Sequence, residues 1–249
     1  MAPNESSMSA AAISNKKPVR GRAGSPPPVA AAVPRLLNGD HLTVPEFERR
    51  CEATPEVKFA ELIEGIVVMS PPISSFHSGP HGVLAGLLQI YAWATPGTDS
   101  DICGSLRLDG QNEFQPDVIL RIKSGPLARC KVAPDGLFEG SPELAGEIAV
   151  SSAGYDLHEK KAVYQRALVR EYFVWQVMDA QIHWFVLEEG QYAELKPRPG
   201  GVICSRVFPG LWLDVRALLA GEKAELRRTL DKGIKSAEHR TFLRKLRDS

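Results

Sequence analysis

The stretch that decides the fold runs from Glu143 to Trp175 and reads ELAGEIAVSSAGYDLHEKKAVYQRALVREYFVW. Its first ten residues form an apolar, strand-like run that is interrupted by one carboxylate, Glu147. A helical pattern follows from Asp156, which has Glu159 three residues later, as in a capping box that starts a helix. The final EYFVW is again strand-like. The stretch therefore predicts a strand, a helix and a second strand in that order.

The spacing within this helix separates two neighbouring lysines. One stripe at i, i+3, i+4 and i+7 contains Lys160, Val163, Tyr164 and Ala167. Lys161 falls to the side of that stripe. Because three members of the stripe are side chains that favour burial, we expect Lys160 to share the inward face of the helix and Lys161 to lie beside it.

A second carboxylate belongs to QPDVIL, residues 115–120, where Asp117 stands directly before another strand-like run. Two carboxylates on adjacent strands can hold a hard cation such as Mg²⁺, here together with the backbone carbonyl of Ile148. Such a cation activates a water molecule for phosphodiester hydrolysis. Asp117 and Glu147 are therefore candidate metal ligands. Lys160 is a candidate for orienting the water or stabilising the phosphate.

Each of these residues also has a simpler structural explanation. Pro-Asp is common where a strand starts, and a carboxylate in an apolar strand can be neutralised by a structural salt bridge, here between Glu147 and Lys160. Asp156 fits a helix cap better than a metal ligand. Taken singly, the residues leave both interpretations open.

The chain before this stretch predicts several short elements. Thr43 can cap a helix over 44–53, and ELIEGIVVMSPP, residues 61–72, predicts two strands with a turn at Glu64-Gly65. The main core helix is expected over 81–94, with a stripe formed by Val83, Leu87, Ile90 and Tyr91.

Residues 101–110 and 115–124 read as strands, and 125–142 as a loop long enough to cover a site. After residue 171 the chain predicts a strand meander with a turn at Glu189-Gly190. Helices and strands are mixed without strict alternation. The predicted class is therefore α/β or α+β, with a mixed β-sheet flanked by helices and a C-terminal strand meander.

The formal net charge of zero hides a split along the chain. Residues 1–35, rich in Ala, Pro and Ser, carry +4 and are expected to be a disordered arm. Residues 222–249 also carry +4 (nine Lys/Arg against five Asp/Glu) and read as an exposed amphipathic helix. The domain expected between them, 36–221, is left with 0 − 4 − 4 = −8. An acidic domain argues against a broad, passive nucleic-acid surface but not against a carboxylate metal site.

Composition excludes several other classes. The four cysteines are far apart without a CxxC pair, so neither a zinc knuckle nor a dense disulfide framework is indicated. No apolar run approaches the roughly 18 residues of a membrane span, which favours a cytoplasmic protein with no membrane partner. A metal-independent hydrolase is disfavoured because there is no GxSxG motif, and ATP-driven action because there is no Gly-rich phosphate loop.

At this point the sequence resembles the Uma-two family of restriction-endonuclease-like proteins, widespread in cyanobacteria and other bacteria and built on the PD-(D/E)xK nuclease fold. The similarity runs in order from ELIEGIVVMSPP through QPDVIL and ELAGEIAVSS to DLHEKKAVYQRALVREYFVW, over roughly residues 45–215. It implies that Asp117, Glu147 and Lys160 match the acid, acid and lysine of the active site. The lysine position of the usual motif is Ala149 here, and Lys160 from the following helix takes its place.

The resemblance also implies further site residues, namely Glu61 and His77, with His81 competing for the histidine position and Asp156 as an additional candidate. The leading interpretation is a Mg²⁺-dependent endonuclease, with Mn²⁺ as an alternative ion, that hydrolyses DNA through a metal-activated water. The other interpretation is a non-catalytic nuclease-fold domain that binds nucleic acid or a protein partner. A homodimer would suit an enzyme that cuts both strands.

Overall fold

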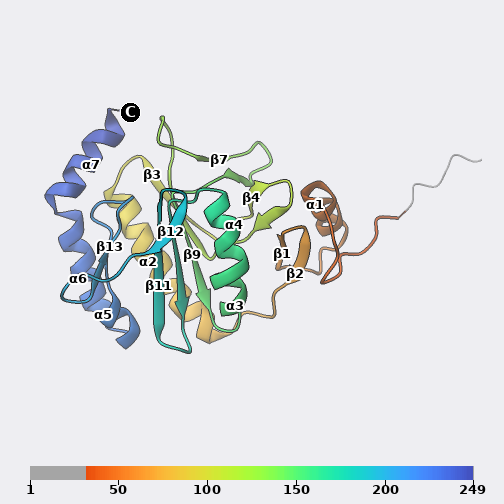
Figure 1. Ribbon diagram of the computed structural model, residues 1–249, viewed down its shortest axis with the longest axis horizontal. Helices are drawn as coiled ribbons and strands as arrows, with labels where there is room; N and C mark the ends of the chain where they lie inside the picture. Colours follow the sequence, from red (N-terminus) through yellow and green to blue (C-terminus); the bar gives the residue numbers. More distant parts are fainter. Residues whose placement is uncertain (1–31, 249) are drawn as a thin grey trace, which may run out of the picture. The chain divides into compact units, whose positions relative to one another are not determined.

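Two six-stranded mixed sheets and their flanking helices make up residues 32–248, the part that the computed structural model describes (Figure 1). Residues 1–31 of the predicted arm lie outside the described residues. The chain from Val33 onward is one compact unit. The mixed α/β architecture with flanking helices that the sequence predicts is thereby confirmed.

One sheet carries most of the site, and its strands lie in the order β12-β11-β10-β9-β6-β3. Their bounds are β12 (Gln191–Glu194), β11 (Gln181–Glu188), β10 (Glu171–Gln176), β9 (Leu144–Ala149), β6 (Val118–Ile122) and β3 (Thr98–Ile102). Strands β9 and β10 are parallel because the helical segment between them carries the chain back to the starting edge. The other neighbouring strands are antiparallel, with tight turns such as Glu189-Gly190.

The second sheet has the order β2-β1-β5-β4-β8-β7. Its strands are β2 (Ile66–Met69), β1 (Ala60–Ile63), β5 (Asn112–Phe114), β4 (Leu106–Asp109), β8 (Phe138–Gly140) and β7 (Cys130–Val132). The predicted turn at Glu64-Gly65 joins β1 to β2, and both turn residues have positive φ. A small hairpin of β13 (Val202–Cys204) and β14 (Trp212–Asp214) stands apart from both sheets.

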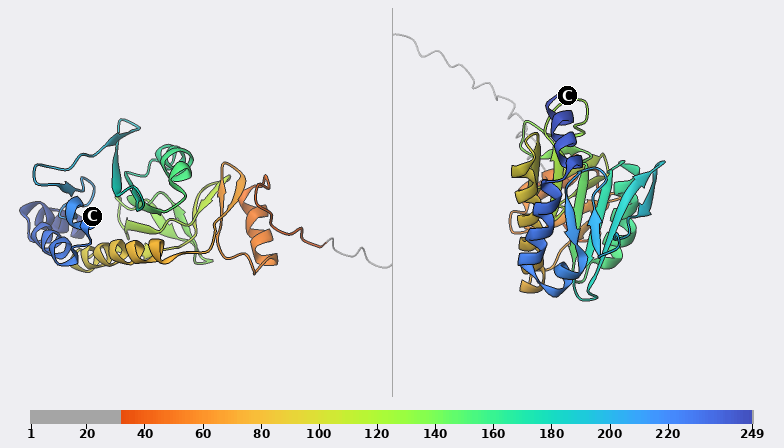
Figure 2. Two further views of the ribbon diagram at one scale, coloured as in Figure 1. Left: turned by 90° about the horizontal axis from the view of Figure 1, so that it is seen from below. Right: turned by 90° about the vertical axis from the view of Figure 1, so that its left-hand side faces the viewer.

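Helices cover both faces of the first sheet. One face packs against α2 (Ser75–Ala94), and late in the chain α5 (Val215–Ala220), α6 (Lys223–Ile234) and α7 (Ala237–Arg247) join the same hydrophobic core, with α6 lying against α2 and β14. The other face packs against the helical run α3 (Ala153–Tyr155), η1 (Asp156–Lys160) and α4 (Lys161–Arg166), as the end-on view in Figure 2 shows. The helix α1 (Val44–Ala53) packs on β1 and β2 in a third cluster.

Helix α2 differs from the sequence-based expectation in its start and in its buried face. It begins at Ser75 and runs through Pro80, six residues before the expected start at His81. Its fully buried residues are Leu84, Leu88, Tyr91 and Ala92, whereas Val83, Leu87 and Ile90 are only partly buried. The helix is apolar on more than one side, so periodicity alone did not fix which side turns inward.

Three further expectations are wrong. Residues 101–110 are two strands of different sheets, separated by Cys103 at positive φ, and 125–142 contains β7 and β8 instead of being a loop over the site. Asp156 does not cap a helix, because the helical run already begins at Ala153. In the region expected to be one exposed helix, 222–249, the described residues form two helices, whose Leu226, Leu230 and Phe242 are buried in the main core.

None of the helices within residues 32–248 is both long and apolar enough to cross a membrane.

Candidate active site

Asp117 and Glu147 meet across the β6–β9 pair. Val118 of β6 lies opposite Gly146 of β9 in the antiparallel register, so the preceding residue Asp117 stands beside Glu147. The backbone N–H of Ile148 donates to Asp117 Oδ2 over 2.7 Å, which fixes the carboxylate against the end of β9. Both carboxylates line a cavity of about 190 Å³. This is the arrangement on neighbouring strands that the sequence predicts.

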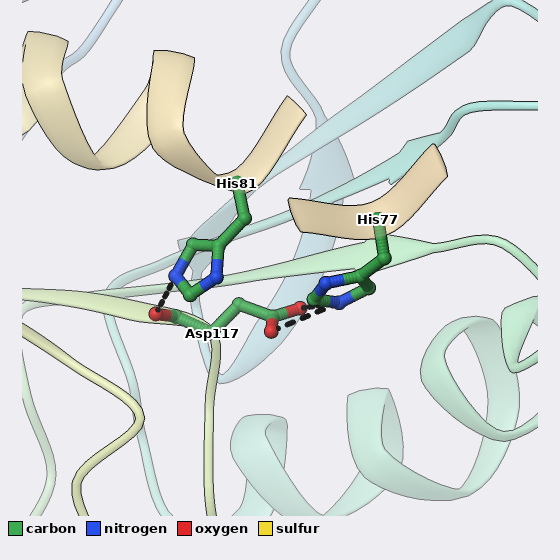
Figure 3. Close-up of side chains that lie close together, drawn as sticks. All are labelled: His77, His81 and Asp117. Atoms are coloured by element: carbon green, nitrogen blue, oxygen red, sulfur yellow. Dashed lines mark hydrogen bonds and ion pairs between the residues drawn. The ribbon is translucent and has the colours of Figure 1, made fainter. Parts of the chain in front are cut away.

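Two histidines of α2 reach the same aspartate, as Figure 3 shows. His77 Nε2 lies 3.1 Å from Asp117 Oδ1, and His81 Nε2 lies 2.8 Å from the backbone oxygen of Asp117. Because α2 begins at Ser75, the two imidazoles are one helical turn apart and point to one side. The hydrogen bond to Asp117 raises the pKa of His77 above its ordinary value, against the opposing effect of burial.

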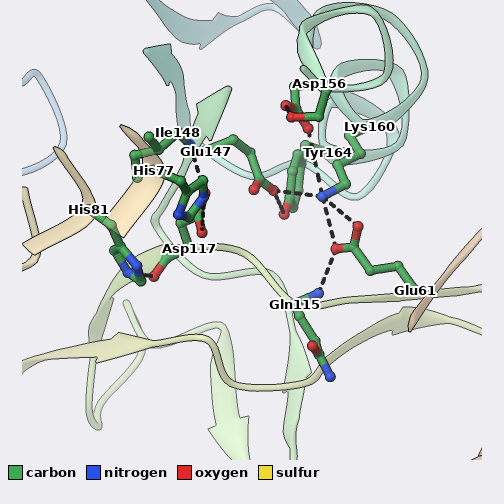
Figure 4. A network of polar contacts seen from close by, with 11 residues as sticks. Glu61, His77, His81, Gln115, Asp117, Glu147, Ile148, Asp156, Lys160 and Tyr164 are labelled. Carbon is green, nitrogen blue, oxygen red and sulfur yellow. Dashed lines mark hydrogen bonds and ion pairs between the residues drawn. The ribbon is translucent and has the colours of Figure 1, made fainter. Parts of the chain in front are cut away.

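A second group of charges surrounds Lys160 (Figure 4). Its ammonium lies 2.7 Å from Glu61 Oε2, 3.2 Å from Glu147 Oε1 and 3.7 Å from Asp156 Oδ1. Tyr164 also donates from its hydroxyl to Glu147 Oε1 over 3.1 Å. A lysine ammonium has three N–H donors, so three carboxylates can occupy all of them. We call Lys160, Glu61, Glu147 and Asp156 the lysine cluster.

The lysine cluster has more negative than positive groups, and all four side chains are at most 9% exposed. Burial, and then the charges of Asp156, Asp117 and Glu61, raise the pKa of Glu147 well above its usual range, although Lys160 acts in the opposite direction. Burial disfavours the charged form of Lys160, but the carboxylates, Glu147 foremost, outweigh it and raise the pKa of the lysine. Lys160 therefore stays charged while Glu147 holds a proton more readily than an ordinary glutamate.

The helical segment that supplies Lys160 is locally a π-helix, η1. Such wider turns often occur at functional sites in other proteins. Here η1 buries Asp156 and Lys160 together, and Ser152 Oγ donates to Asp156 Oδ2 over 2.5 Å. Lys161, the next residue, points elsewhere and lies 3.9 Å from the centroid of the Phe185 ring. The inward stripe predicted for Lys160, and the sideways position of Lys161, are both present.

The two sheets meet at this cavity. Glu61 comes from β1 of one sheet, whereas Glu147 comes from β9 of the other. The backbone N–H of Gln115 donates to Glu61 Oε1 over 2.8 Å and ties the two parts together. The cavity lining includes Ile148 and six of the side chains that the sequence proposed for the site, namely Glu61, His77, Asp117, Glu147, Asp156 and Lys160. His81, the competing histidine, is not part of the lining.

Sequence reasoning missed two features of the site. Tyr164 was assigned to the apolar stripe, but its hydroxyl binds Glu147. His77 and His81 were treated as competitors, whereas the structure places both beside Asp117. The spacing of four residues between the histidines was the available signal. It predicts that both imidazoles lie on one side only if a single helix contains both residues.

Metal-binding geometry can be tested on the described residues. Within 32–248, one group of at least three His, Cys or acidic side chains has ligand atoms close enough to share an ion, and it consists of His77, His81 and Asp117, whose ligand atoms lie within 4.8 Å of one another. Glu147, the other predicted metal ligand, does not belong to this group. His77 Nδ1 is buried without a hydrogen-bond partner. Two imidazole nitrogens and a carboxylate oxygen are a fitting donor set for a divalent transition ion.

Comparisons with known proteins bear on the fold and on the family of the chain. A solved structure titled as a putative nuclease belonging to DUF820, from Anabaena variabilis ATCC 29413, superposes with a TM-score of 0.55 at 12% identity. The match covers 72% of this chain and 98% of that chain. At this identity the similarity defines the class by its fold, a nuclease-like mixed sheet flanked by helices.

The family can be stated more narrowly. The model of the Uma2 family, described as "Putative restriction endonuclease", matches residues 44–216, which is more than half of the chain. The chain belongs to this family, the one that the sequence motifs resemble. No curated protein matches the chain.

Proposed function

We propose that this protein is a divalent-metal-dependent endonuclease that hydrolyses phosphodiester bonds of DNA. The observation that carries the proposal is the pairing of Asp117 and Glu147 across β6 and β9, with Lys160 in the same cavity. Family membership supports a nuclease activity. The metal, the DNA substrate and the roles of individual residues belong to the proposal.

Asp117 and Glu147 would hold the ion, with the backbone carbonyl of Ile148 as a further oxygen ligand. Mg²⁺ suits these oxygen ligands. The imidazoles of His77 and His81 beside Asp117 favour a transition ion such as Mn²⁺ more than an oxygen-only site does. A bound divalent ion supplies Lewis-acid chemistry, since it lowers the pKa of water and neutralises charge on the phosphate.

The protein's own groups orient these ligands. The Ile148 N–H holds one oxygen of Asp117, and the Tyr164 hydroxyl holds one oxygen of Glu147. Fixed second partners of this kind keep a ligand in one orientation. Lys160 shares its ammonium among three carboxylates. A divalent ion bound by Glu147 would neutralise part of the negative charge that Lys160 otherwise neutralises. The Lys160 ammonium would then be able to donate a hydrogen bond to a phosphate oxygen.

One observation favours the second candidate, a non-catalytic nuclease-fold domain that binds nucleic acid or a protein. The Lys160 ammonium donates to Glu61 and Glu147 and forms an ion pair with Asp156 at 3.7 Å, as it would in a purely structural ion cluster. Under this alternative the cluster stabilises the contact between the two sheets. A homodimer for cutting both strands stays a prediction.

A cleavage assay on linear, circular and single-stranded DNA with Mg²⁺ or Mn²⁺ separates the two candidates. The endonuclease proposal expects cleavage by the wild type and its loss in Asp117→Asn and Glu147→Gln. The matched control is Glu171→Gln, which changes another buried glutamate on the neighbouring strand β10, outside the cavity lining. Calorimetric titration with Mn²⁺ measures binding independently of cleavage. If the wild type neither cuts nor binds metal through these acids, the non-catalytic candidate replaces the proposal.

A further inference from the structure

The mouth of the cavity carries exposed apolar side chains from three separate segments. Phe59 precedes β1 and is 40% exposed, Ile73 lies between β2 and α2 and is 48% exposed, and Tyr155 ends α3 and is 49% exposed. All three line the same cavity as Asp117. A polar mouth would suffice to admit water and ions, so apolar side chains gathered here indicate a ligand with an apolar part.

The charges of the cavity are poorly suited to a duplex. Among the described residues that line it, Lys160 is the one Lys or Arg, and it is already bound to three carboxylates. Proteins that bind duplex DNA neutralise many phosphates with Lys and Arg, and this contact supplies most of the sequence-independent affinity. The cavity therefore has to gain affinity from a part of the nucleic acid other than its phosphates.

Bases supply that part when they are unpaired. An aromatic side chain stacks on the face of any base, but the face is available only when the base is not enclosed in a duplex. The cavity of about 190 Å³ is smaller than the roughly 300–1,000 Å³ pockets that enclose drug-sized ligands. It therefore suits a single flat ring system near the mouth and not a segment of double helix.

We propose that the cavity binds an unpaired nucleotide strand, with a base stacked on Phe59 or Tyr155 while the adjoining phosphate faces the divalent ion that Asp117 and Glu147 would hold. This inference rests on the proposed function and narrows its substrate class to single-stranded or locally unpaired nucleic acid. A single strand needs one active site, so this substrate does not require a dimer.

Equilibrium binding tests the proposal without cleavage. Fluorescence anisotropy with labelled oligo(dT), a duplex of equal length and oligo(rU) is measured in EDTA and again with Ca²⁺. The oligo(dT) and oligo(rU) arms distinguish a DNA from an RNA source of the unpaired base. We expect the wild type to bind a single strand at least about tenfold more tightly than the duplex.

Ring-removing variants locate the contact. Phe59→Leu and Tyr155→Leu keep an apolar side chain but lose the ring, and the loss of one stacked base corresponds to about five- to 150-fold weaker binding. Tyr155→Phe keeps the ring and should bind like the wild type. Trp93→Leu is the matched control, because Trp93 is 75% exposed on α2 and does not line the cavity. Circular dichroism of each variant verifies its fold.

The outcomes distinguish this proposal from the function it rests on. Strand-selective binding that depends on Phe59 or Tyr155, without any cleavage in Mn²⁺, supports the inference and rejects the nuclease. Cleavage of duplex DNA with equal or tighter duplex binding supports the nuclease and overturns the inference. Unchanged affinity in both Leu variants, or no binding of any oligonucleotide, also overturns it.

Discussion

Two fully buried glutamates stand on neighbouring parallel strands, yet they are bound in opposite ways. Glu147 of β9 is 4% exposed, accepts from the Lys160 ammonium and the Tyr164 hydroxyl, and lines the cavity. Glu171 of β10 is 0% exposed and lies outside the cavity lining. Its carboxylate accepts from the Ser205 hydroxyl over 2.6 Å and from the Arg206 N–H over 2.6 Å.

The difference teaches which buried carboxylates deserve a functional interpretation. Glu171 is held by neutral donors of the loop that follows β13, and Glu143 is likewise held by the backbone N–H groups of Ile122 and Arg129. These two acids join loops to strands. Glu147 is held by two side chains instead, the charged Lys160 ammonium and the Tyr164 hydroxyl. Burial of a carboxylate therefore does not by itself identify the functional site. The hydrogen-bond partners of the carboxylate distinguish Glu147 from the two structural glutamates.

The largest effect is expected for Lys160→Met, which leaves the acids of the lysine cluster without their cation. Removing one partner of a buried ion pair typically costs about 3–5 kcal/mol, and here three carboxylates lose it. Urea denaturation at pH 7.5 measures the loss. Lys161→Met is the control, because the Lys161 ammonium lies over the Phe185 ring and is not part of the lysine cluster. This variant should lose about 1 kcal/mol or less of the free energy of unfolding. Equal losses in both variants would contradict a special role for Lys160.

Next in size is Glu171→Ala, which leaves the Ser205 hydroxyl and the backbone N–H groups of Arg206 and Val207 without their acceptor. Each buried unsatisfied group costs about 1–3 kcal/mol, so the free energy of unfolding should fall by about 3 kcal/mol. The variant should still bind Mn²⁺ as the wild type does, because Glu171 does not line the cavity. Chemical denaturation and calorimetric titration together measure both properties. Loss of metal binding in a folded Glu171→Ala protein would remove the distinction between the two glutamates.

The pH dependence of stability sharpens the comparison further. Burial raises the pKa of Glu171 from 4.5 to about 7, despite the hydrogen bonds that favour its charged form. Between these values the folded protein holds a proton that the unfolded chain has released, so stability is fully present below pH 4.5 and falls as pH rises through 7. The fall from pH 5 to pH 8 should be about 2–3 kcal/mol for this group.

Glu171→Gln, which cannot titrate, should lack the part of the decrease in stability between pH 5 and pH 8 that Glu171 causes. Denaturation midpoints of the variant and the wild type are compared across the pH range, and their difference isolates Glu171 from other titrating groups. Parallel curves for the two proteins would show that the pKa of Glu171 is the same in the folded and the unfolded state.

The smallest effect is expected for Glu147→Gln. A neutral amide resembles the protonated acid that the surroundings of Glu147 favour, and Lys160 keeps Glu61 and Asp156 as partners. Stability at pH 7.5 should therefore change by about 1 kcal/mol or less, whereas Mn²⁺ binding by calorimetry should be lost. A stability loss as large as that of Glu171→Ala would place Glu147 among the structural carboxylates.

Local patterns predicted much of this arrangement. The turn at Glu64-Gly65, the strand of Glu147 and the inward position of Lys160 all follow from sequence periodicity and turn residues within a few positions of each other. The family motifs then placed Asp117 and Glu147 together, and the register of β6 with β9 agrees.

What could not be predicted depends on contacts between distant segments. The start of α2 at Ser75, ahead of Pro80, decides that His77 and His81 share one side. Ser74 is a favoured N-cap residue, but a proline inside the helix argues against so early a start. Leu226 and Leu230 predict an amphipathic helix, but their spacing does not show which part of the protein packs against the apolar face of that helix. Asp156 resembles a cap in sequence, yet its burial near Lys160 turns the carboxylate inward.

The late helices have a consequence for how the chain is made. Leu226, Leu230 and Phe242 belong to the same core as Val118 of β6, more than 100 residues earlier. During translation the ribosome releases these side chains after every strand of both sheets. The part of this core that α6 and α7 cover must therefore remain open to water, or to chaperones, until these helices emerge. Nascent chains arrested before Lys223 should expose these apolar side chains and be the species most prone to aggregate.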